Sequence, residues 1–246
     1  MTAIELGAQD LSGAAIGKEL GVDRIELCSA LTLDGLTSSL GLIERAIEVG
    51  PDVHVLIRPR AGGFVYSADE LALTLADVRH TVRAGAAGIV IGALDEFGMP
   101  DLDFVARCVE AADGLEVTFH RAIDVSADIL EAASMLVGTG VSRILTSGGA
   151  ESAFEGRPVL RRMVDVCGEQ IQVQAGGGVT PENARAIAET GVAAIHFSAR
   201  RFVREQSPQP SSPDTGSDAA ATSADFGGYE TTDPDIAAAT VAAVRG

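Results

Sequence analysis

Short β-strand patterns alternate with helical patterns about eight times between residues 4 and 200, which restricts the chain to few folds. Strands joined through helices run parallel, and about eight such units over this length are typical of a TIM barrel. The alternative is a doubly wound open sheet, whose strands are continuous apolar runs because helices cover both faces. Several strands here alternate apolar with polar residues. The sequence therefore predicts an α/β fold, the TIM (β/α)8 barrel with a closed parallel sheet.

The predicted boundaries divide the chain into three parts. Residues 1–203 form the barrel, and residues 236–246 form a C-terminal helix that closes it. Between them, residues 204–235 are rich in Ser, Pro and Asp, which is typical of a loop or disordered insert. Polar residues able to cap a helix, some followed by acid or by proline, predict where helices begin. These predicted starts are Asp10 or Ser12, Ser39, Ser67, Asp101, Ser126, Pro158 and Thr180–Pro181.

The stretch from Val117 to Asp124 places ionisable groups at the end of a predicted strand. Val117 and Phe119 alternate with Thr118 and His120, so one face of the strand is dry and the other polar. His120, Arg121 and Asp124 then gather at the C-terminal end of the strand. Ligand sites of parallel α/β proteins lie at this end of the strands. We therefore expect the site at the C-terminal mouth of the barrel.

The same alternation predicts a polar barrel interior. Buried charges persist only when they are paired, so Glu5 or Glu26 could form a structural ion pair with Arg58, or these groups could serve a site. Glu26, Arg58 and His120 are expected to converge in one pocket. The full set predicted to face the interior is Glu5, Glu26, Cys28, His54, Arg58, Glu116, Thr118, His120, Gln172, Gln174, His196 and Ser198.

Charge and composition exclude several classes of partner. The formal charge of −17 argues against nucleic acid and anionic membranes. The chain shows no signal peptide and no apolar run long enough to span a bilayer, so we expect a cytoplasmic protein. Its 3 cysteines form no CxxC pair. Arginines gathered inside so acidic a protein indicate an anionic ligand. The sequence does not determine the oligomeric state, and a homo-oligomer is possible.

The residues near the mouth suggest acid–base work on a small anion. Glu26 and His120 are candidate general acid and base, with Asp124 as a further catalytic candidate. Arg58 and Arg60 flank Pro59, and we expect both guanidiniums to face the mouth as an anion clamp. Candidate anion-binding residues are Arg58, Arg60, Arg121, Thr146, Ser147, Gly176, Gly177, Gly178 and Ser198. The glycines could leave backbone N–H groups free for a phosphate or carboxylate, or form only a tight turn.

Several of these motifs, in fixed order, make the chain resemble the CutC family, named for copper homeostasis. The likeness covers residues 3 to 200 and implies a TIM-type barrel, a cytoplasmic location and an association with copper. The stretches that carry it are Arg24-Ile25-Glu26-Leu27-Cys28, Ile57-Arg58-Pro59-Arg60, Val117-Thr118-Phe119-His120-Arg121-Ala122 with Asp124, Arg143-Ile144-Leu145-Thr146-Ser147-Gly148, Gly178-Val179 with Asn183, and His196-Phe197-Ser198.

The chain departs from the family pattern at two places near the mouth. Gly7 occupies a position where relatives often carry a cysteine, so the thiolate pair that the family would form with Cys28 lacks one half. Ala61-Gly62-Gly63-Phe64 replaces the family's Gly-Gly-Asp-Phe, which removes an acidic group. Asp225 and Tyr229 are the residues of the Ser/Pro-rich tail that could match polar residues there.

Three hypotheses for function follow. The resemblance implies a copper homeostasis protein, and copper(I), which prefers thiolate and accepts imidazole, could be held by Cys28, His120 and His196. The alternative is an enzyme that acts on a small phosphate- or carboxylate-bearing metabolite at the mouth. The third is a regulatory or scaffold barrel. Copper homeostasis is the first hypothesis, and the enzyme is the alternative.

Overall fold

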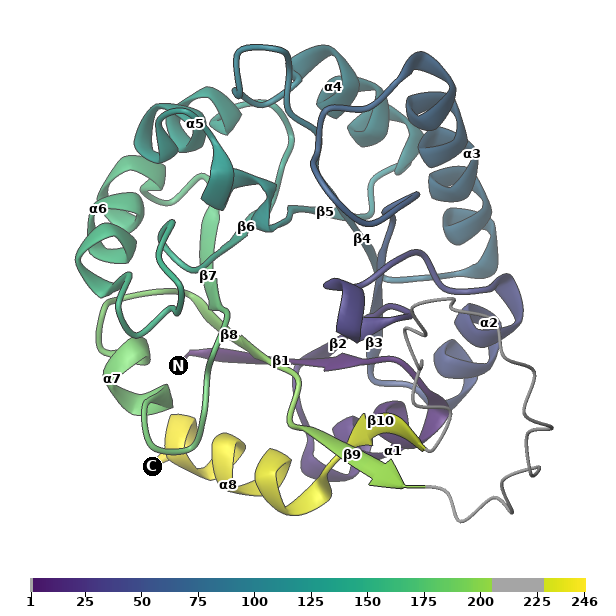
Figure 1. Ribbon diagram of the computed structural model, residues 1–246, viewed down its shortest axis with the longest axis vertical. Coiled ribbons are helices and arrows are strands. Elements are labelled where there is room, and N and C mark those ends of the chain that lie inside the picture. The colour runs from purple at the N-terminus through teal and green to yellow at the C-terminus, as the bar shows by residue number, and fades with distance from the viewer. Residues whose placement is uncertain (1, 205–227) are drawn as a thin grey trace, which may run out of the picture.

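The computed structural model describes residues 2–204 and 228–246, and its centre is a closed barrel of parallel strands in the order β1 to β8 (Figure 1). This confirms the predicted TIM (β/α)8 fold. The barrel strands are β1 (Ala3–Ala8), β2 (Arg24–Leu27), β3 (Asp52–Leu56), β4 (Gly88–Ile91), β5 (Glu116–Phe119), β6 (Arg143–Thr146), β7 (Gln172–Gly176) and β8 (Ala194–Phe197). The ring closes because β1 pairs in parallel with both β2 and β8.

Helices surround the barrel on its outside (Figure 1). They are α1 (Leu11–Leu20), α2 (Leu40–Val49), α3 (Ala68–Ala84), α4 (Leu102–Ala111), α5 (Ile129–Leu136), α6 (Arg157–Cys167), α7 (Ala184–Ala188) and α8 (Pro234–Arg245). Two short 3-10 segments, η1 (Leu31–Leu33) and η2 (Arg121–Val125), follow β2 and β5. None of the helices in the described part of the chain has both the length and the apolar character needed to cross a bilayer.

Side-chain caps fix where several helices begin. The Asp10 carboxylate accepts from the Gly13 N–H at 2.7 Å, and Asp101 accepts from Phe104 at 3.0 Å. Ser67 and Glu70 form a reciprocal capping box at the start of α3. These starts were predicted, since such oxygens satisfy N–H groups that a helix leaves unpaired.

Two predicted helix starts are wrong. The helix expected at Ser126 begins at Ile129, because Asp128 caps it and the preceding residues form η2. The helix expected from Thr180–Pro181 begins only at Ala184, because the Asn183 side chain bonds the Thr180 N–H and holds these residues in a turn.

The segment after the barrel contains more structure than predicted. β9 (Arg200–Arg204) and β10 (Gly228–Thr232) form an antiparallel pair, and α8 begins at Pro234. The prediction of an irregular insert over 204–235 is therefore wrong for residue 204, which ends β9, and for residues 228–235. The remainder of that insert, with Asp225, lies outside the described residues.

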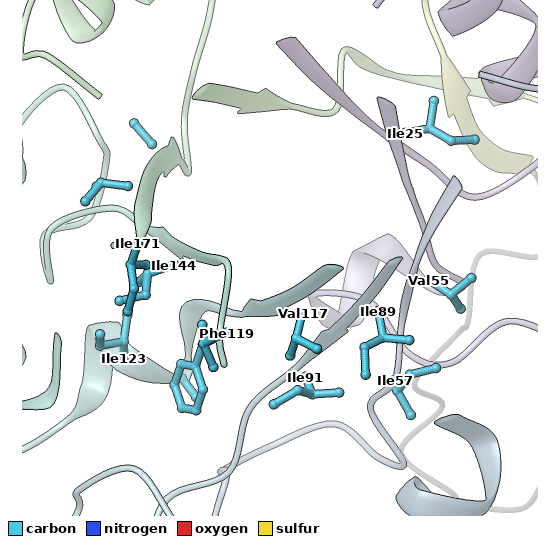
Figure 2. Close-up of a cluster of buried hydrophobic side chains, with 14 of the residues drawn as sticks. Ile25, Val55, Ile57, Ile89, Ile91, Val117, Phe119, Ile123, Ile144 and Ile171 are labelled. Carbon is cyan, nitrogen blue, oxygen red and sulfur yellow. The ribbon is translucent and has the colours of Figure 1, made fainter. Parts of the chain in front are cut away.

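The apolar core lies between the strands and the helices (Figure 2). Aliphatic residues on the outward face of the strands, such as Ile25, Val55, Ile89 and Val117, are at most 1% exposed. Because successive strand residues point to opposite faces, their polar neighbours are directed into the barrel. The fold thus delivers ionisable groups to the interior.

Candidate functional site

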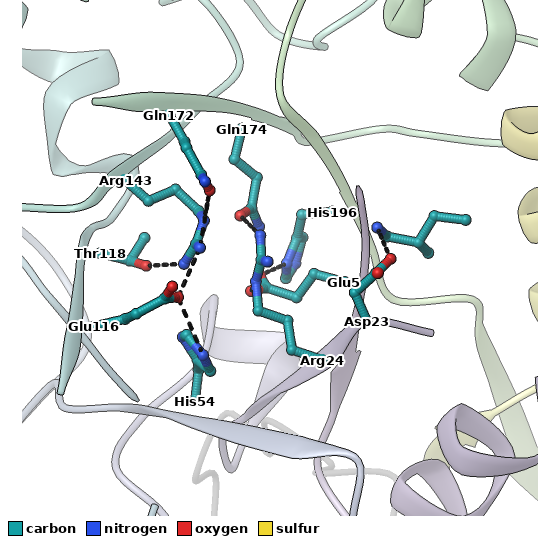
Figure 3. Close-up of polar contacts among 11 residues, drawn as sticks. Glu5, Asp23, Arg24, His54, Glu116, Thr118, Arg143, Gln172, Gln174 and His196 are labelled. Atoms are coloured by element: carbon teal, nitrogen blue, oxygen red, sulfur yellow. Dashed lines mark hydrogen bonds and ion pairs between the residues drawn. The ribbon is translucent and has the colours of Figure 1, made fainter. Parts of the chain in front are cut away.

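Two hydrogen-bonded charge networks occupy the interior of the barrel (Figure 3). In the first, the Arg24 Nε donates to the Glu5 carboxylate at 2.7 Å and its Nη2 donates to Gln174 at 2.8 Å. Gln174 also donates to Glu5. His196 Nδ1 completes the set with a 2.8 Å bond to Glu5. Every polar group of Glu5 is thus used by neighbours from other strands.

The second network is centred on Arg143, which is 1% exposed. Its guanidinium donates to Glu116 at 2.7 Å, to Thr118 at 3.1 Å and to Gln172 at 3.0 Å (Figure 3). The His54 Nε2 lies 3.6 Å from Glu116. The buried Arg143 guanidinium is thus fully paired, as a buried charge must be. None of these side chains lines the pocket at the mouth of the barrel.

Arg24 and Arg143 are the residues that the sequence reasoning missed. Both are the first residue of a strand, and Arg24 lies two positions before Glu26, so the alternation could have placed it in the interior. The structural ion pair expected between Glu5 or Glu26 and Arg58 is instead formed by Glu5 with Arg24.

A pocket of about 760 Å³ lies at the C-terminal ends of the strands. Its volume is typical of a small-molecule site. The predicted convergence of Glu26, Arg58 and His120 in one pocket is confirmed. Its lining residues are Glu26, Leu31, Asp34, Leu56, Arg58, Phe64, His120, Arg121, Asp124, Val125, Leu145, Gly177, Gly178, Val179, Thr180, Pro181, Glu182, His196, Phe197, Ser198, Ala199, Arg200 and Ile236.

His120 lines this pocket and has a buried ring N–H without a partner among the described residues. Its Nδ1 accepts a hydrogen bond from the Ala122 N–H at 3.1 Å, so Nε2 carries the ring proton. Nε2 is buried and has no partner among the described residues. Burial, assisted by the charge of Arg58, lowers the pKa of His120 to about 3. The imidazole is therefore a neutral hydrogen-bond donor near neutral pH.

Glu26 presents an unpaired carboxyl oxygen. The residue is 7% exposed, and its Oε2 finds no partner in the described part of the chain. Burial, with repulsion from Glu5, outweighs the attraction of His196 and Arg24 and raises the pKa of Glu26 to about 7. The carboxyl group can therefore gain or lose a proton near neutral pH.

His196 lies between the Glu5 network and Glu26. Burial would lower the pKa of His196, but the two carboxylates Glu26 and Glu5 outweigh it and raise this pKa. Burial would raise the pKa of Glu5, yet the bond from His196 and the charge of Arg24 hold it well below its usual range. The two carboxylates therefore favour the protonated form of His196, which also lines the pocket.

Asp124 serves to fix the adjoining loops rather than to offer a free carboxylate. It accepts hydrogen bonds from the Thr146 hydroxyl at 2.5 Å, from the Ser147 N–H at 3.0 Å and from the Gly149 N–H at 3.1 Å. It also accepts from Arg121 Nε at 2.8 Å. The catalytic role predicted for Asp124 is thus not supported, since its acceptor sites are filled.

The polar groups of Thr146 and Ser147 are likewise engaged within the protein. Both side chains are 0% exposed and bond to Asp124, so they are absent from the pocket lining. Of the glycines predicted to bind an anion, Gly177 and Gly178 line the pocket, and Gly176 is part of β7. Ser198 lines the pocket as predicted.

The expected clamp of Arg58 and Arg60 is not formed. Arg58 lines the pocket, but its terminal nitrogens donate to the carbonyls of Leu33, Gly35 and Gly62. Arg60 points away and pairs with Glu70 at the start of α3. The prediction failed because β3 ends at Leu56, so the side chains of residues 58 and 60 do not share a strand face.

The three predicted copper ligands are not brought together. Cys28 is 0% exposed, packs with Leu56 and Val90, and does not line the pocket. Burial, with the nearby Glu26 carboxylate, raises the pKa of the Cys28 thiol far above its usual value. Among the described residues, the group of His, Cys, Asp and Glu side chains close enough to share one ion is Glu5, Glu26 and His196. It contains no sulfur ligand, which copper(I) prefers.

Comparisons with known proteins agree on one family. The sequence profile of the CutC family matches residues 2–201. A CutC family protein of Glaesserella parasuis is 42% identical over 199 residues, which cover 80% of this chain and 82% of that protein. A relative of the same description from Xanthomonas campestris is 40% identical over 221 residues, which cover 87% and 91%.

A solved structure supports the same assignment. The crystal structure of a CutC protein from Streptococcus agalactiae, described as a candidate copper homeostasis protein, is 33% identical, with a TM-score of 0.72. The match covers 80% of this chain and 98% of that one. With the profile, the relatives and the barrel in agreement, the chain belongs to the CutC family.

Proposed function

We propose that the chain is a cytoplasmic enzyme that transfers a proton within a small anionic metabolite bound at the C-terminal mouth of the barrel. One observation carries this proposal. Glu26 Oε2 and His120 Nε2 are both buried, both without a partner among the described residues, and both in residues that line one pocket. Unpaired buried polar atoms are costly, so their presence at a pocket favours a ligand that completes their hydrogen bonds.

The two groups are complementary for chemistry at a carbon next to a carbonyl. The ionised Glu26 carboxylate accepts the proton from that carbon, and the electron pair of the broken C–H bond moves onto the carbonyl oxygen. That oxygen accepts a hydrogen bond from His120 Nε2–H, which stabilises the developing negative charge. On a substrate whose carbon also bears a hydroxyl, the hydroxyl proton passes to the former carbonyl oxygen and Glu26 returns its proton to the former carbonyl carbon. The carbonyl and hydroxyl groups thereby exchange positions, and no further reactant is needed.

The protonation states of the two residues suit these roles. A general base is most effective when its pKa lies near the working pH, and the pKa of Glu26 is raised to about 7. His120 remains neutral because its pKa is lowered to about 3. A neutral imidazole that carries its proton on Nε2 donates a hydrogen bond from that atom. Glu5 holds His196 beside Glu26, and the charge of the protonated His196 ring lowers the pKa of the base.

A link to copper homeostasis is suggested by the family name, and it is the second candidate. The described residues do not combine a thiolate with imidazole at the pocket, and Arg58 and Arg121 add positive charge there. The same purified protein can address both candidates when its metal content is measured alongside its reaction with metabolites.

The proposal is tested with a cell metabolite extract and untargeted mass spectrometry. The parent protein is expected to deplete at least one anionic compound and form its isomer. Glu26→Gln should lose this conversion, and Glu48→Gln, which removes an exposed carboxylate on α2, should keep it. Stoichiometric copper in the purified parent, with no compound changed, would instead support copper handling and contradict the enzyme.

A further inference from the structure

We infer that the pocket contains a phosphate subsite formed by the Arg121 guanidinium and the backbone N–H groups of Gly177, Gly178 and Val179, so that the metabolite is a phosphate monoester. This inference rests on the proposed function, because it names the anion that the enzyme binds. All four residues line the same pocket as Glu26.

Two hydrogen bonds hold the Arg121 side chain in place and leave its Nη1 atom without an acceptor among the described residues. Its Nε donates to Asp124 at 2.8 Å and its Nη2 donates to the Ser147 hydroxyl at 3.2 Å. Asp124 is itself fixed by the Ser147 and Gly149 N–H groups. Within residues 2–204 and 228–246, no acceptor is bonded to Arg121 Nη1. A planar guanidinium held in this way can bind oxyanions without losing further side-chain freedom.

The glycine loop runs directly beside this guanidinium. A Cβ atom added at Gly177 would lie 3.3 Å from Arg121 Cζ and 3.4 Å from Nη1. Any side chain there would fill the space next to the cation. Gly177 and Gly178 also have φ values of 105° and 65°, a region that other residues rarely adopt. Both glycines are therefore needed to bring bare backbone close to Arg121.

Three N–H groups of this loop have no hydrogen-bond partner in the described part of the chain. The Gly177 carbonyl accepts from the Ala153 N–H at 2.9 Å. The N–H groups of Gly177, Gly178 and Val179 take part in no loop or side-chain hydrogen bond among the described residues. Backbone N–H groups that face a concavity are a common means of binding anions.

The number of donors favours phosphate over carboxylate. Arg121 Nη1 has two N–H groups, which together with three backbone N–H groups make about five donors. A phosphate monoester offers three strongly accepting oxygens, whereas a carboxylate offers two and would leave donors unpaired.

The subsite orients the substrate relative to the acid–base pair. With the phosphate at Arg121 and the glycine loop, the rest of a small molecule extends into the pocket that Glu26 and His120 line. The substrate class is then a small phosphorylated aldehyde or ketone. The phosphate contributes binding energy and position, and the carbonyl end undergoes the proton transfer.

The test measures binding of two probes by isothermal titration calorimetry at constant ionic strength. The probes are inorganic phosphate and glycerol 3-phosphate, with glycerol and chloride as the matching compounds that lack phosphate. The parent should bind both phosphate-bearing probes and neither of the others. Arg121→Gln should weaken binding about tenfold or more, as expected when a charged hydrogen bond is lost. Arg60→Gln removes the same charge outside the pocket and should bind as the parent does.

Three results would overturn the subsite: no binding of phosphate by the parent, equal binding by Arg121→Gln, or an equal loss in Arg60→Gln. Because Arg121 also anchors Asp124, Arg121→Lys provides a second variant that retains the charge. It should recover part of the affinity if the side chain binds the anion, and none if the charge is irrelevant.

Glu26→Gln should still bind phosphate, so a parent that binds phosphate but converts no metabolite contradicts the proposed function alone. Conversion of substrates without phosphate at equal rates contradicts the subsite alone.

Discussion

The Nδ1 atom of His120 accepts a hydrogen bond from the backbone N–H of Ala122 at 3.1 Å, and this contact determines which ring nitrogen carries the proton. The ring donor that lacks a partner among the described residues is then Nε2–H. Gly92 makes this arrangement sterically feasible, because a Cβ atom there would overlap the imidazole ring. The orientation of the proposed electrophile therefore depends on the turn after β5 and on one glycine of the neighbouring strand end.

The fixed tautomer predicts how His120 behaves in solution. Because burial and Arg58 lower the pKa of His120 to about 3, its ring should stay neutral from pH 5 to 8. The pKa of His196 is raised, so that ring should titrate above about 6.5. Two-dimensional ¹⁵N NMR of the imidazoles distinguishes these states. A His120 ring that titrates between pH 5 and 8, or that is protonated on Nδ1, would contradict the assignment.

The Glu5 network should be essential for stability. Glu5→Gln leaves the buried Arg24 guanidinium and the His196 ring without their carboxylate, and the expected loss in unfolding free energy is about 3–5 kcal/mol. Glu48→Gln removes an exposed carboxylate paired with Arg45 and should change stability by less than about 1 kcal/mol. Urea denaturation of both variants provides the comparison. Equal effects of the two substitutions would mean that the Glu5 network does not stabilise the fold.

Glu26 should make the fold less stable as pH rises. Its pKa is raised from 4.5 in the unfolded chain to about 7, so the folded state holds the proton more tightly. The resulting stabilisation is complete below pH 4.5 and is lost as pH rises through 7. Compared with the parent, Glu26→Gln should therefore gain stability between pH 5 and pH 8, by more than about 1 kcal/mol, because one unit of pKa is worth about 1.4 kcal/mol. Melting at both pH values measures this, and a difference that does not depend on pH would show that Glu26 titrates normally.

The alternation of apolar and polar residues along the strands was sufficient to identify most of the side chains that face the barrel interior. It placed Glu26 and His120 in one pocket because side chains two apart on a strand share a face, whatever the tertiary partners are. Arg24 and Arg143 were overlooked because they stand at strand starts, where the pattern has no preceding residue to set its phase. The partner of Arg60 could not be foreseen, since Glu70 becomes its neighbour only when α3 packs beside the chain after β3.

Other features depend on contacts between segments that are far apart in the sequence. β10 pairs with β9, and its Glu230 carbonyl accepts from the Gln9 side chain at 2.8 Å. Five residues with the composition of Gly228–Thr232 do not predict a strand alone. The same holds for Asp124, whose saturation by Thr146 and the following loop becomes evident only when β5 and β6 lie side by side.

Copper binding should not depend on Cys28. The thiol is buried against Leu56 and Val90, and its pKa is raised, so the thiolate that binds copper(I) is not available. Cys28→Ala should change copper(I) affinity less than about twofold, measured by competition with a chelator, and Cys108→Ala serves as the matched control. A tenfold loss in Cys28→Ala alone would restore Cys28 as a ligand.

Gly7 gives the complementary experiment. A Cβ atom there would lie 3.2 Å from His196 Nε2, so Gly7→Cys would place a thiol beside an imidazole. We expect this variant to bind copper(I) more tightly than the parent, because copper(I) prefers sulfur ligands. If the affinity is unchanged in the same competition assay, a cysteine at this position does not create a copper site.

The most direct measurement of the central claim is the uptake of solvent deuterium. The protein is incubated in D₂O with small phosphorylated aldehydes and ketones, and mass spectrometry records replacement of the hydrogen next to the carbonyl. The parent should catalyse exchange into at least one of them, and Glu26→Gln should be slower by about 10²–10⁴, the range for removal of a general base. Exchange that is equally fast in the parent and in Glu26→Gln, or absent from the whole series with the parent, would contradict a proton-transfer enzyme at this pocket.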